Sequence, residues 1–254
     1  MKRSLVLLFA AVVALTACQQ EIRTERLSLE EDIPFSEGSQ FQLGLRADVE
    51  FPTSGFDKDA LADVRKAIRV ACFGDTFADF TDTPEKLGEA WRNWSVEGYK
   101  STNEELLRDM GITEKEAFNL NWNSEVDGAF GEIYRNWVNY NVEQYNYEGG
   151  AHGMFGQSPM VFDRRTGERV NWDVFTGNLH PDLLKALLDE YKFDNMGEKV
   201  EDIDRDNVFY VDSIEPSQWF SVDEKGITFY YQPYDIAPYV FGVIDITIPW
   251  DEIH

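Results

Sequence analysis

The chain has 254 residues, of which 43% are hydrophobic and 28% charged, with 18 Gly and 9 Pro. This composition is typical of a folded globular protein and excludes disordered and collagen-like chains. Asp and Glu number 47 against 23 Lys and Arg, so the formal net charge is -24 at pH 7. Such a charge repels phosphate backbones, and nucleic acid is therefore excluded as a partner.

The first residues have the pattern of an export signal. Lys2 and Arg3 precede an apolar run over residues 5–14, and Leu15-Thr16-Ala17-Cys18 follows. The run is shorter than the roughly 20 residues that a membrane-spanning helix needs. A small-residue site that ends directly in a cysteine resembles the lipobox of bacterial lipoproteins, whereas the alternative is an ordinary signal peptide with a coincidental cysteine.

The lipobox resemblance implies that residues 1–17 are removed and that Cys18 carries the lipid. The protein is then expected in the bacterial cell envelope, held to the membrane through its lipid anchor only. Gln19 stands where an Asp often signals retention at the inner membrane, which favours the outer membrane and leaves the exposed face open. Cys72 becomes the sole remaining thiol, and we expect it in the core of a helix face rather than as a catalytic nucleophile.

The first half of the mature chain reads as a tether followed by strands and helices. Residues 18–38 are polar and acidic, which predicts a spacer, and residues 41–51 alternate like a half-buried strand. A helix is expected over 57–72, and a second one begins at Thr83 with proline at its first position. Residues 118–147 predict an antiparallel strand pair with its turn near residues 127–128.

The second half predicts a further set of strands around one helix. After a glycine-rich connection at 149–156, residues 159–172 favour a hairpin, and Pro181 opens a helix. Strands are expected over 220–231 and 240–249. The predicted class is α+β, with antiparallel sheets, helices packed on one side, and two closely packed subdomains at 39–146 and 147–254.

Three segments carry a resemblance to a known family. These are Tyr-Glu-Gly-Gly-Ala-His-Gly at 147–153, Thr166-Gly167 followed by Val174-Phe175, and the tail from Gly226 to Tyr239 with Gly242. Together they resemble the domain of unknown function in lysozyme-sensing anti-sigma factors of the RsiV type and in the non-catalytic part of polysaccharide deacetylases of the PdaC type. Residues 39–146 resemble the companion N-terminal domain of those proteins through weaker motifs.

The resemblance implies an envelope-exposed α+β module without a demonstrated shared catalytic activity. Some relatives capture lysozyme, and others accompany enzymes that modify peptidoglycan. The sequence departs from both, because we find neither the sigma-binding segment and transmembrane helix of the anti-sigma factors nor room for the deacetylases' metal-dependent domain. We therefore do not expect this chain to have the complete activity of either the anti-sigma factors or the deacetylases.

The loop around His152 is the first candidate site. Glu148, Gly149 and Gly150 precede the histidine, and glycines allow positive φ angles and a close backbone approach to an anion or a carbonyl group. In the alternative, the glycines only make a turn and His152 hydrogen-bonds across it. As a general base His152 would need a positioned partner, which one sequence does not place.

The tail offers a second candidate, an aromatic recognition edge of Tyr230, Tyr231, Tyr234 and Asp235. Adjacent tyrosines on a strand point to opposite faces, so one of Tyr230 and Tyr231 is exposed unless both faces are covered. The alternative is a covered face with a proline-shaped loop. Most of the 7 tryptophans are expected in the core rather than on a glycan-binding face.

No cofactor is expected. Zinc lacks a ligand set, because the 3 histidines have no metal-binding spacing. Asp202, Asp204 and Asp206 alternate like the start of a calcium loop, but Asn207 replaces its glycine and Ser213 its final glutamate, which favours an acidic solvated loop.

These observations favour a lipid-anchored binding module of the cell envelope over an enzyme. Its expected ligand is a basic, lysozyme-like protein or a peptidoglycan-type glycan, because an acidic surface suits a basic partner. The alternative is a cell-wall hydrolase or deacetylase-like enzyme whose site is the 149–153 loop with His152 as base. A structural role in an envelope assembly is the third hypothesis.

Overall fold

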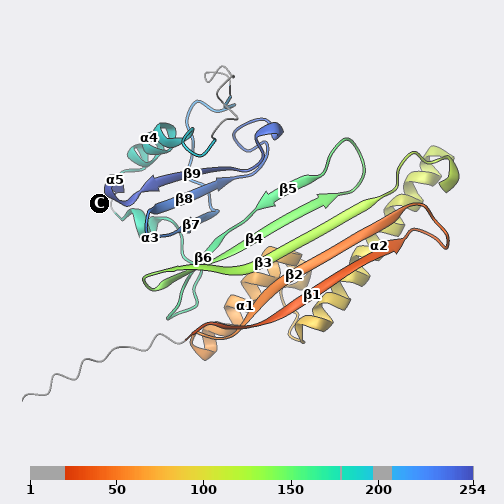
Figure 1. Cartoon of the computed structure of the whole chain (residues 1–254), viewed down its shortest axis with the longest axis horizontal. Coiled ribbons are helices and arrows are strands. Elements are labelled where there is room, and N and C mark those ends of the chain that lie inside the picture. The colour runs from red at the N-terminus through yellow and green to blue at the C-terminus, as the bar shows by residue number, and fades with distance from the viewer. Residues whose placement is uncertain (1–20, 178, 197–207, 254) are drawn as a thin grey trace, which may run out of the picture.

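The computed structural model describes residues 21–177, 179–196 and 208–253, and confirms the predicted α+β class (Figure 1). Within these residues, six strands form a first sheet in the order β1-β2-β3-β4-β5, with β6 also paired to β4, and three form a second sheet in the order β7-β8-β9. The strands of the first sheet are β1 (Arg23–Pro34), β2 (Gln42–Ser54), β3 (Trp122–Tyr134), β4 (Trp137–Tyr147), β5 (Met154–Gln157) and β6 (Met160–Asp163). Those of the second are β7 (Phe220–Val222), β8 (Gly226–Tyr231) and β9 (Ile244–Pro249).

The helices lie between these strands in the chain, except the last one, which follows β9. They are α1 (Lys58–Phe73), α2 (Pro84–Met110), α3 (Asp173–Thr176), α4 (Pro181–Tyr191) and α5 (Trp250–Ile253), with short 3-10 turns η1 (Asp75–Phe77), η2 (Glu114–Glu116) and η5 (Tyr239–Phe241). Helix α2 begins as predicted, because Pro84 needs no N–H partner and the Thr83 hydroxyl accepts from the Lys86 N–H at 3.4 Å. It ends at Gly111 in the left-handed conformation.

The expected spacer is instead part of the fold. Residues 23–34 form β1, an edge strand that pairs antiparallel with β2 along its whole length. Leu27 and Ile33 are buried on the side of the helices, and Glu31 on the same side binds Arg92 of α2 at 2.6 and 2.7 Å. The acidic composition hid the strand, because Glu30, Glu31 and Asp32 stand together in its second half and interrupt the apolar alternation.

The first sheet is mixed rather than purely antiparallel. Strands β2 and β3 pair in parallel, from Leu43 opposite Trp122 to Val49 opposite Gly128. A parallel neighbour requires a long crossover, and α1 and α2 supply it. Both helices lie against the same face of the sheet (Figure 1), as the sequence predicted.

The core of this half lies between the two helices and the sheet. Val49, Val64, Ile68, Tyr99 and Tyr140 are fully buried there. Cys72 is 3% exposed and belongs to the same cluster, which confirms its prediction as a core residue. Burial raises the pKa of the Cys72 thiol, so the thiolate needed for nucleophilic chemistry is disfavoured.

The turn between β3 and β4 falls at residues 135–136, and the predicted turn at 127–128 is wrong. Gly128 lies inside β3 opposite Val142, where an added Cβ would come within 2.5 Å of the Tyr140 hydroxyl. The glycine therefore marks a close approach of a side chain to the backbone. Arg135, at φ 55°, makes the actual turn.

The second half matches the predicted helix at Pro181 and the strands at 220–222 and 226–231. Asp163 Oδ1 accepts from the backbone of Arg165 at 2.8 Å and forms the predicted turn, but the strand expected at 169–172 is reduced to one bridge between Phe162 and Arg169. Residues 239–241 form η5, and the last strand begins only at Ile244, because Pro238 precedes that turn and Gly242 at φ 70° ends it.

The two halves meet at β6. Met160 and Phe162 belong to the core beneath α1 and α2, whereas Val161 points into the core of the second sheet. Strands β5 and β6 follow residue 147 in the chain and still belong to the first sheet. Among the described residues, we find no helix that is long and apolar enough to cross a membrane.

Candidate functional site

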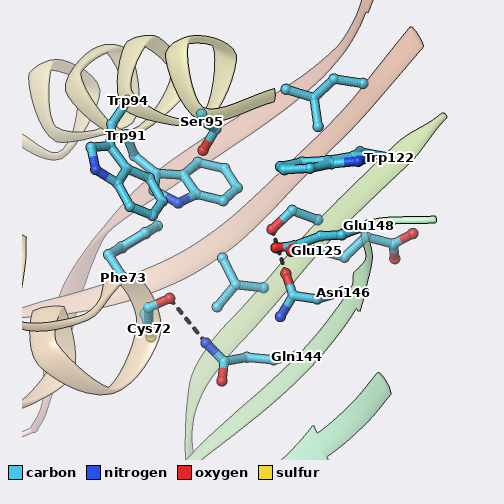
Figure 2. Close-up of a pocket in the computed structure, with 14 residues that line it drawn as sticks. Cys72, Phe73, Trp91, Trp94, Ser95, Trp122, Glu125, Gln144, Asn146 and Glu148 are labelled. Atoms are coloured by element: carbon cyan, nitrogen blue, oxygen red, sulfur yellow. Dashed lines mark hydrogen bonds between the residues drawn. The ribbon is translucent and has the colours of Figure 1, made fainter. Parts of the chain in front are cut away.

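A cavity of about 350 Å³ opens between α2, the end of α1 and the strands β3 and β4. Its size is at the lower end of small-molecule sites, which span roughly 300–1,000 Å³. Figure 2 shows Trp91 and Trp94 on the helix side and Trp122, Asn146 and Glu148 on the sheet side. The lining residues are Leu43, Cys72, Phe73, Trp91, Trp94, Ser95, Gly98, Trp122, Ser124, Glu125, Val126, Gln144, Asn146 and Glu148.

Three indole rings border the cavity. Trp91 and Trp94 are one helical turn apart on α2, so both face the same side. Trp91 is 5% exposed and packs edge-to-face on Phe73 at 5.4 Å, whereas Trp94 is 55% exposed. Trp122 lies across the opening, with its ring 5.6 Å from that of Tyr99. Packing of Trp91 and Trp122 against buried rings fixes their positions before any ligand arrives.

Polar groups of β3 and β4 form the opposite wall. The Ser124 hydroxyl donates to Asn146 Oδ1 at 2.7 Å, so the amide nitrogen is the donor that the Asn146 side chain offers. Gln144 Nε2 donates to the Cys72 carbonyl at 3.1 Å and ties β4 to the end of α1 (Figure 2). The cavity thus combines flat aromatic surfaces with a few fixed polar groups, the usual composition of a small-molecule site.

The charge of the cavity is negative. Among the described residues, Glu125 and Glu148 line it, with Glu125 on the outer face of the sheet by strand register, and no Lys, Arg or His does. The Glu125 carboxylate accepts from Asn123 Nδ2 at 2.6 Å and lies 3.8 Å from an Arg46 nitrogen, so it is already engaged. Glu148 directly follows β4 and is exposed at the rim. It is therefore the carboxylate best placed to meet a ligand.

Gly98 keeps one side of the cavity open. It lies in the interior of α2, where glycine costs roughly 0.5–1 kcal/mol relative to alanine. A Cβ built there meets no atom within 4 Å, so no packing clash requires glycine. The missing side chain leaves space one helical turn beyond Trp94.

The loop that the sequence singled out has a different neighbourhood. Gly149 and Gly150 both take φ 92°, and His152 is exposed. The His152 ring stacks on Tyr239 at 4.0 Å, with Nδ1 3.0 Å from the Gly153 carbonyl oxygen. Both of these groups are uncharged. Glu148, only four residues before His152, belongs to the tryptophan cavity.

The structure brings His152 and Tyr234 together from the two predicted sites. His152 Nε2 lies 3.4 Å from the Tyr234 hydroxyl, and the rings of Tyr234 and Tyr239 are 5.7 Å apart. Tyr234 is 50% exposed and takes φ 74°. The three rings form one aromatic surface cluster, to which the sequence did not assign Tyr239.

The other residues of the predicted aromatic edge have structural contacts. Tyr231 is 4% exposed and donates to the Glu215 carbonyl at 2.9 Å, and the Tyr230 hydroxyl lies 3.1 Å from that of Ser221. Burial raises the pKa of both tyrosines. Asp235 Oδ2 accepts from the Gln232 N–H at 2.8 Å and closes the turn that carries Tyr234.

The predicted calcium and lipid sites fall outside the described residues. In the part of the chain that the structure describes, no group of three or more His, Cys, Asp or Glu side chains is placed to hold a metal ion. Asp202, Asp204 and Asp206 lie outside the described residues, as do Cys18 and residues 1–17. The calcium and lipid assignments therefore stay predictions.

The cavity itself was missed by reasoning from sequence. Trp91, Trp94 and Gly98 recur at the spacing of one helix face, which is the signal that a sequence can give. The same spacing is also typical of core packing. Trp122 and Asn146 join the helix residues only through the parallel pairing of β2 and β3, which no local pattern indicates.

Together, the fold and the cavity define a two-sheet α+β protein with a lateral cavity bordered by three tryptophans. Residues 173–251 match the family model of DUF3298, described as a protein of unknown function, so the C-terminal part of the chain carries a DUF3298 domain. This confirms the domain of unknown function that the sequence motifs indicated. The likeness to RsiV-type and PdaC-type proteins stays a prediction.

Solved structures share the fold over almost the whole chain. A member of the DUF3298 family from Bacteroides fragilis aligns with a TM-score of 0.77 at 22% identity, covering 92% of each chain. A DUF3298 family protein from Pseudomonas aeruginosa PAO1 aligns with a TM-score of 0.54 at 17% identity, covering 92% of this chain and 93% of the other. No curated protein matches in sequence. At these identities the likeness shows the fold alone.

Proposed function

We propose that the protein is a binding module of the bacterial cell envelope that takes a glycan in the cavity between α2 and β3–β4. The observation that carries this proposal is the set of three indole rings around a 350 Å³ space with polar groups on the facing strands. The apolar faces of sugar rings stack on tryptophan, while their hydroxyls need hydrogen-bond partners such as Ser95, Asn146 and Glu148.

A lipid on Cys18 would hold the start of β1 close to a membrane. Four residues, 19–22, separate Cys18 from the start of β1 at Arg23. Even fully extended, four residues span only about 13–14 Å. This end of the first sheet would therefore lie close to the membrane, whereas the cavity, bordered by Leu43 and Trp122, lies at the level of Ile33 near the other end of β1. This part of the proposal rests on the lipobox resemblance.

Binding of soluble glycan tests the proposal directly. We expect the purified protein to bind peptidoglycan fragments and N-acetylglucosamine oligomers saturably, with a change in tryptophan fluorescence. Trp94→Ala should weaken binding at least fivefold, whereas Phe118→Ala should not, because Phe118 is 101% exposed and does not line the cavity. Absence of saturable binding, or equal binding by Trp94→Ala, would contradict the proposal.

A basic protein is the second candidate ligand, and the outer face of the first sheet favours it. On the side away from the helices, register pairs bring many carboxylates onto one surface: Glu30, Asp32, Asp48, Glu50, Glu125, Asp127 and Glu143. Arg26 bonds Asp48, and Arg46 bonds Asp127 at 2.9 Å, so these two cations offset only part of the charge.

Salt dependence and a double variant distinguish binding of a basic protein from binding of a glycan. Binding of lysozyme to this face should weaken as salt rises from 20 to 200 mM, since the Debye length shortens. The double variant Glu30→Gln/Asp32→Asn should weaken it further and leave glycan binding unchanged. If the affinity for lysozyme changed neither with salt nor in this variant, the acidic face would be excluded as the binding surface.

A further inference from the structure

We infer that the glycan unit in the cavity carries a cationic amine, so that the protein selects an amino sugar over its neutral counterpart. This inference rests on the proposed glycan site and narrows its ligand. Its basis is the juxtaposition of an exposed carboxylate, Glu148, with the exposed indole of Trp94 and with Trp122, in a cavity whose described lining residues include no cationic side chain.

The position of Glu148 follows from the alternation of β4. Gln144 and Asn146 point into the cavity from this strand, and Glu148 continues the same series just after the strand ends. Tyr145 and Tyr147 lie between them on the other face. Figure 2 shows Glu148 on the same side of the cavity as Trp122. A cation that entered between the indoles would therefore come near this carboxylate.

The other nearby carboxylate is not free to play this part. Glu125 is engaged by Asn123 at 2.6 Å and has Arg46 at 3.8 Å. Both partners lie on the outer face of the sheet, away from α2. The charge that Glu125 contributes is thus largely offset there, and selectivity for a cation should depend on Glu148.

The indole rings favour the same ligand charge. A cation over the face of a tryptophan is attracted by the quadrupole of the ring, and tryptophan is the strongest of the aromatic side chains in this respect. Trp94 is 55% exposed and offers its ring without a competing Lys or Arg among the lining residues. The cation–π attraction and the attraction to Glu148 add for an ammonium group and vanish for a hydroxyl.

The charge of the whole chain acts in the same direction. A net charge of -24 raises the local concentration of cationic ligands and lowers that of anionic ones. A uronic acid or a sugar phosphate would meet repulsion both at long range and from Glu148. A neutral sugar would stack on the indoles and gain nothing from the carboxylate.

The decisive experiment compares two tetrasaccharides that differ at one substituent. The β-1,4-linked glucosamine tetramer and cellotetraose have the same rings and linkage, with an ammonium group replacing the 2-hydroxyl in the first. Calorimetry at pH 6 and low salt should show the glucosamine tetramer binding about five- to tenfold more tightly. The preference should fall as salt is raised.

Matched variants assign the preference to Glu148. Glu148→Gln should reduce it to less than twofold, whereas Glu224→Gln should preserve it. Glu224 is exposed in the turn between β7 and β8 and does not line the cavity, so its replacement removes the same charge from the chain. A preference unchanged in Glu148→Gln, or abolished equally by Glu224→Gln, would overturn the inference.

The same data separate failure of the inference from failure of the proposed function. Equal affinity for the two tetramers, with both lost in Trp94→Ala, would overturn amine selection and leave the glycan site standing. Failure of the glucosamine tetramer, cellotetraose and the N-acetylglucosamine tetramer to bind at all would overturn both. Tight binding of the glucosamine tetramer that depends on Trp94 and Glu148 would support both.

Discussion

Asn139 and Val222 are joined by two hydrogen bonds that connect the two sheets. The Val222 N–H donates to Asn139 Oδ1 at 3.0 Å, and Asn139 Nδ2 donates to the Val222 carbonyl at 2.8 Å. Asn139 Nδ2 also lies 2.9 Å from the Glu132 carbonyl, and the residue is 4% exposed. One side-chain amide of β4 thus satisfies both backbone groups of a residue in β7 and holds the two halves of the protein together.

Replacing this amide should destabilise the whole protein. We expect Asn139→Leu to lower the free energy of unfolding by about 2–4 kcal/mol, because it leaves a buried N–H and a buried carbonyl without their partner. Asn141→Leu is the control: Asn141 lies two residues further along β4 and is exposed, so the loss should stay below about 0.5 kcal/mol. Urea unfolding followed by tryptophan fluorescence measures both. Equal losses would contradict the stabilising role of the two hydrogen bonds between Asn139 and Val222.

The hydrogen bonds between Asn139 and Val222 also show what the sequence could and could not predict. Elements with local signals were found, such as the helix that begins at Thr83-Pro84 and the strands around the 223–226 turn. Strand β1 was missed, because its acidic residues obscure the alternation of Leu27, Leu29, Glu31 and Ile33 toward α2. Asn139 gave no signal either, since its partner Val222 is 83 residues away in the chain.

The candidate site also has a part that local sequence signals predicted and a part that depends on long-range contacts. His152 and Glu148 are close in sequence, and their common glycine-rich loop suggested a common site. The alternation of β4 sends Glu148 to the tryptophan cavity, whereas His152 lies past the strand and packs on Tyr239 from a distant loop. Local motifs identified where the backbone is unusual, but the long-range pairing of strands decides which side chains share a cavity.

Gly98 provides a way to close the cavity without removing any group from it. Gly98→Ala should raise the free energy of unfolding by about 0.5–1 kcal/mol, because alanine favours the helix and its Cβ meets no atom within 4 Å. Gly98→Leu should also fold, but its larger side chain should occupy the space beyond Trp94 and weaken glycan binding at least tenfold.

Comparison of these two variants distinguishes loss of binding from loss of folding. Thermal unfolding reports whether each variant is folded, and calorimetry with the glucosamine tetramer reports binding. If Gly98→Leu were stable and bound the sugar as tightly as the unchanged protein, the ligand would have to lie elsewhere.

The ion pair between Glu31 and Arg92 should make β1 sensitive to acid. The hydrogen bond from Arg92 lowers the pKa of Glu31 below its ordinary value of 4.5. A carboxyl group with a lowered pKa in the folded state stabilises the protein above its unfolded pKa, and this contribution is lost as the pH falls through the folded pKa. The contribution should therefore be complete above about pH 5.5 and decline below 4.5.

Arg92→Met should remove this dependence. The difference in thermal midpoint between the unchanged protein and the variant should be largest near pH 6 and shrink as the pH falls to about 3. Arg108→Met is the comparison, since Arg108 meets Glu105 only at 3.9 Å with both side chains mostly exposed. A difference for Arg92→Met that stays constant over this range would show that the loss is one of packing rather than of charge.

His152 should contribute to stability through its ring and not to glycan binding. Its ring stacks on Tyr239 at 4.0 Å, and stacked aromatic pairs contribute about 0.5–1.5 kcal/mol. We expect His152→Ala to lose about 1 kcal/mol and His152→Phe, which keeps a flat ring, to recover most of it. Chemical unfolding of the two variants measures this difference.

The same variants decide between a binding module and an enzyme at the 149–153 loop. A general base at His152 would make both replacements abolish any turnover of peptidoglycan fragments, because phenylalanine restores the stack but holds no proton. In our interpretation both variants bind the glucosamine tetramer like the unchanged protein, since His152 does not line the tryptophan cavity. Loss of binding or turnover in the stable His152→Phe variant would instead place the functional site on the aromatic surface cluster of His152, Tyr234 and Tyr239.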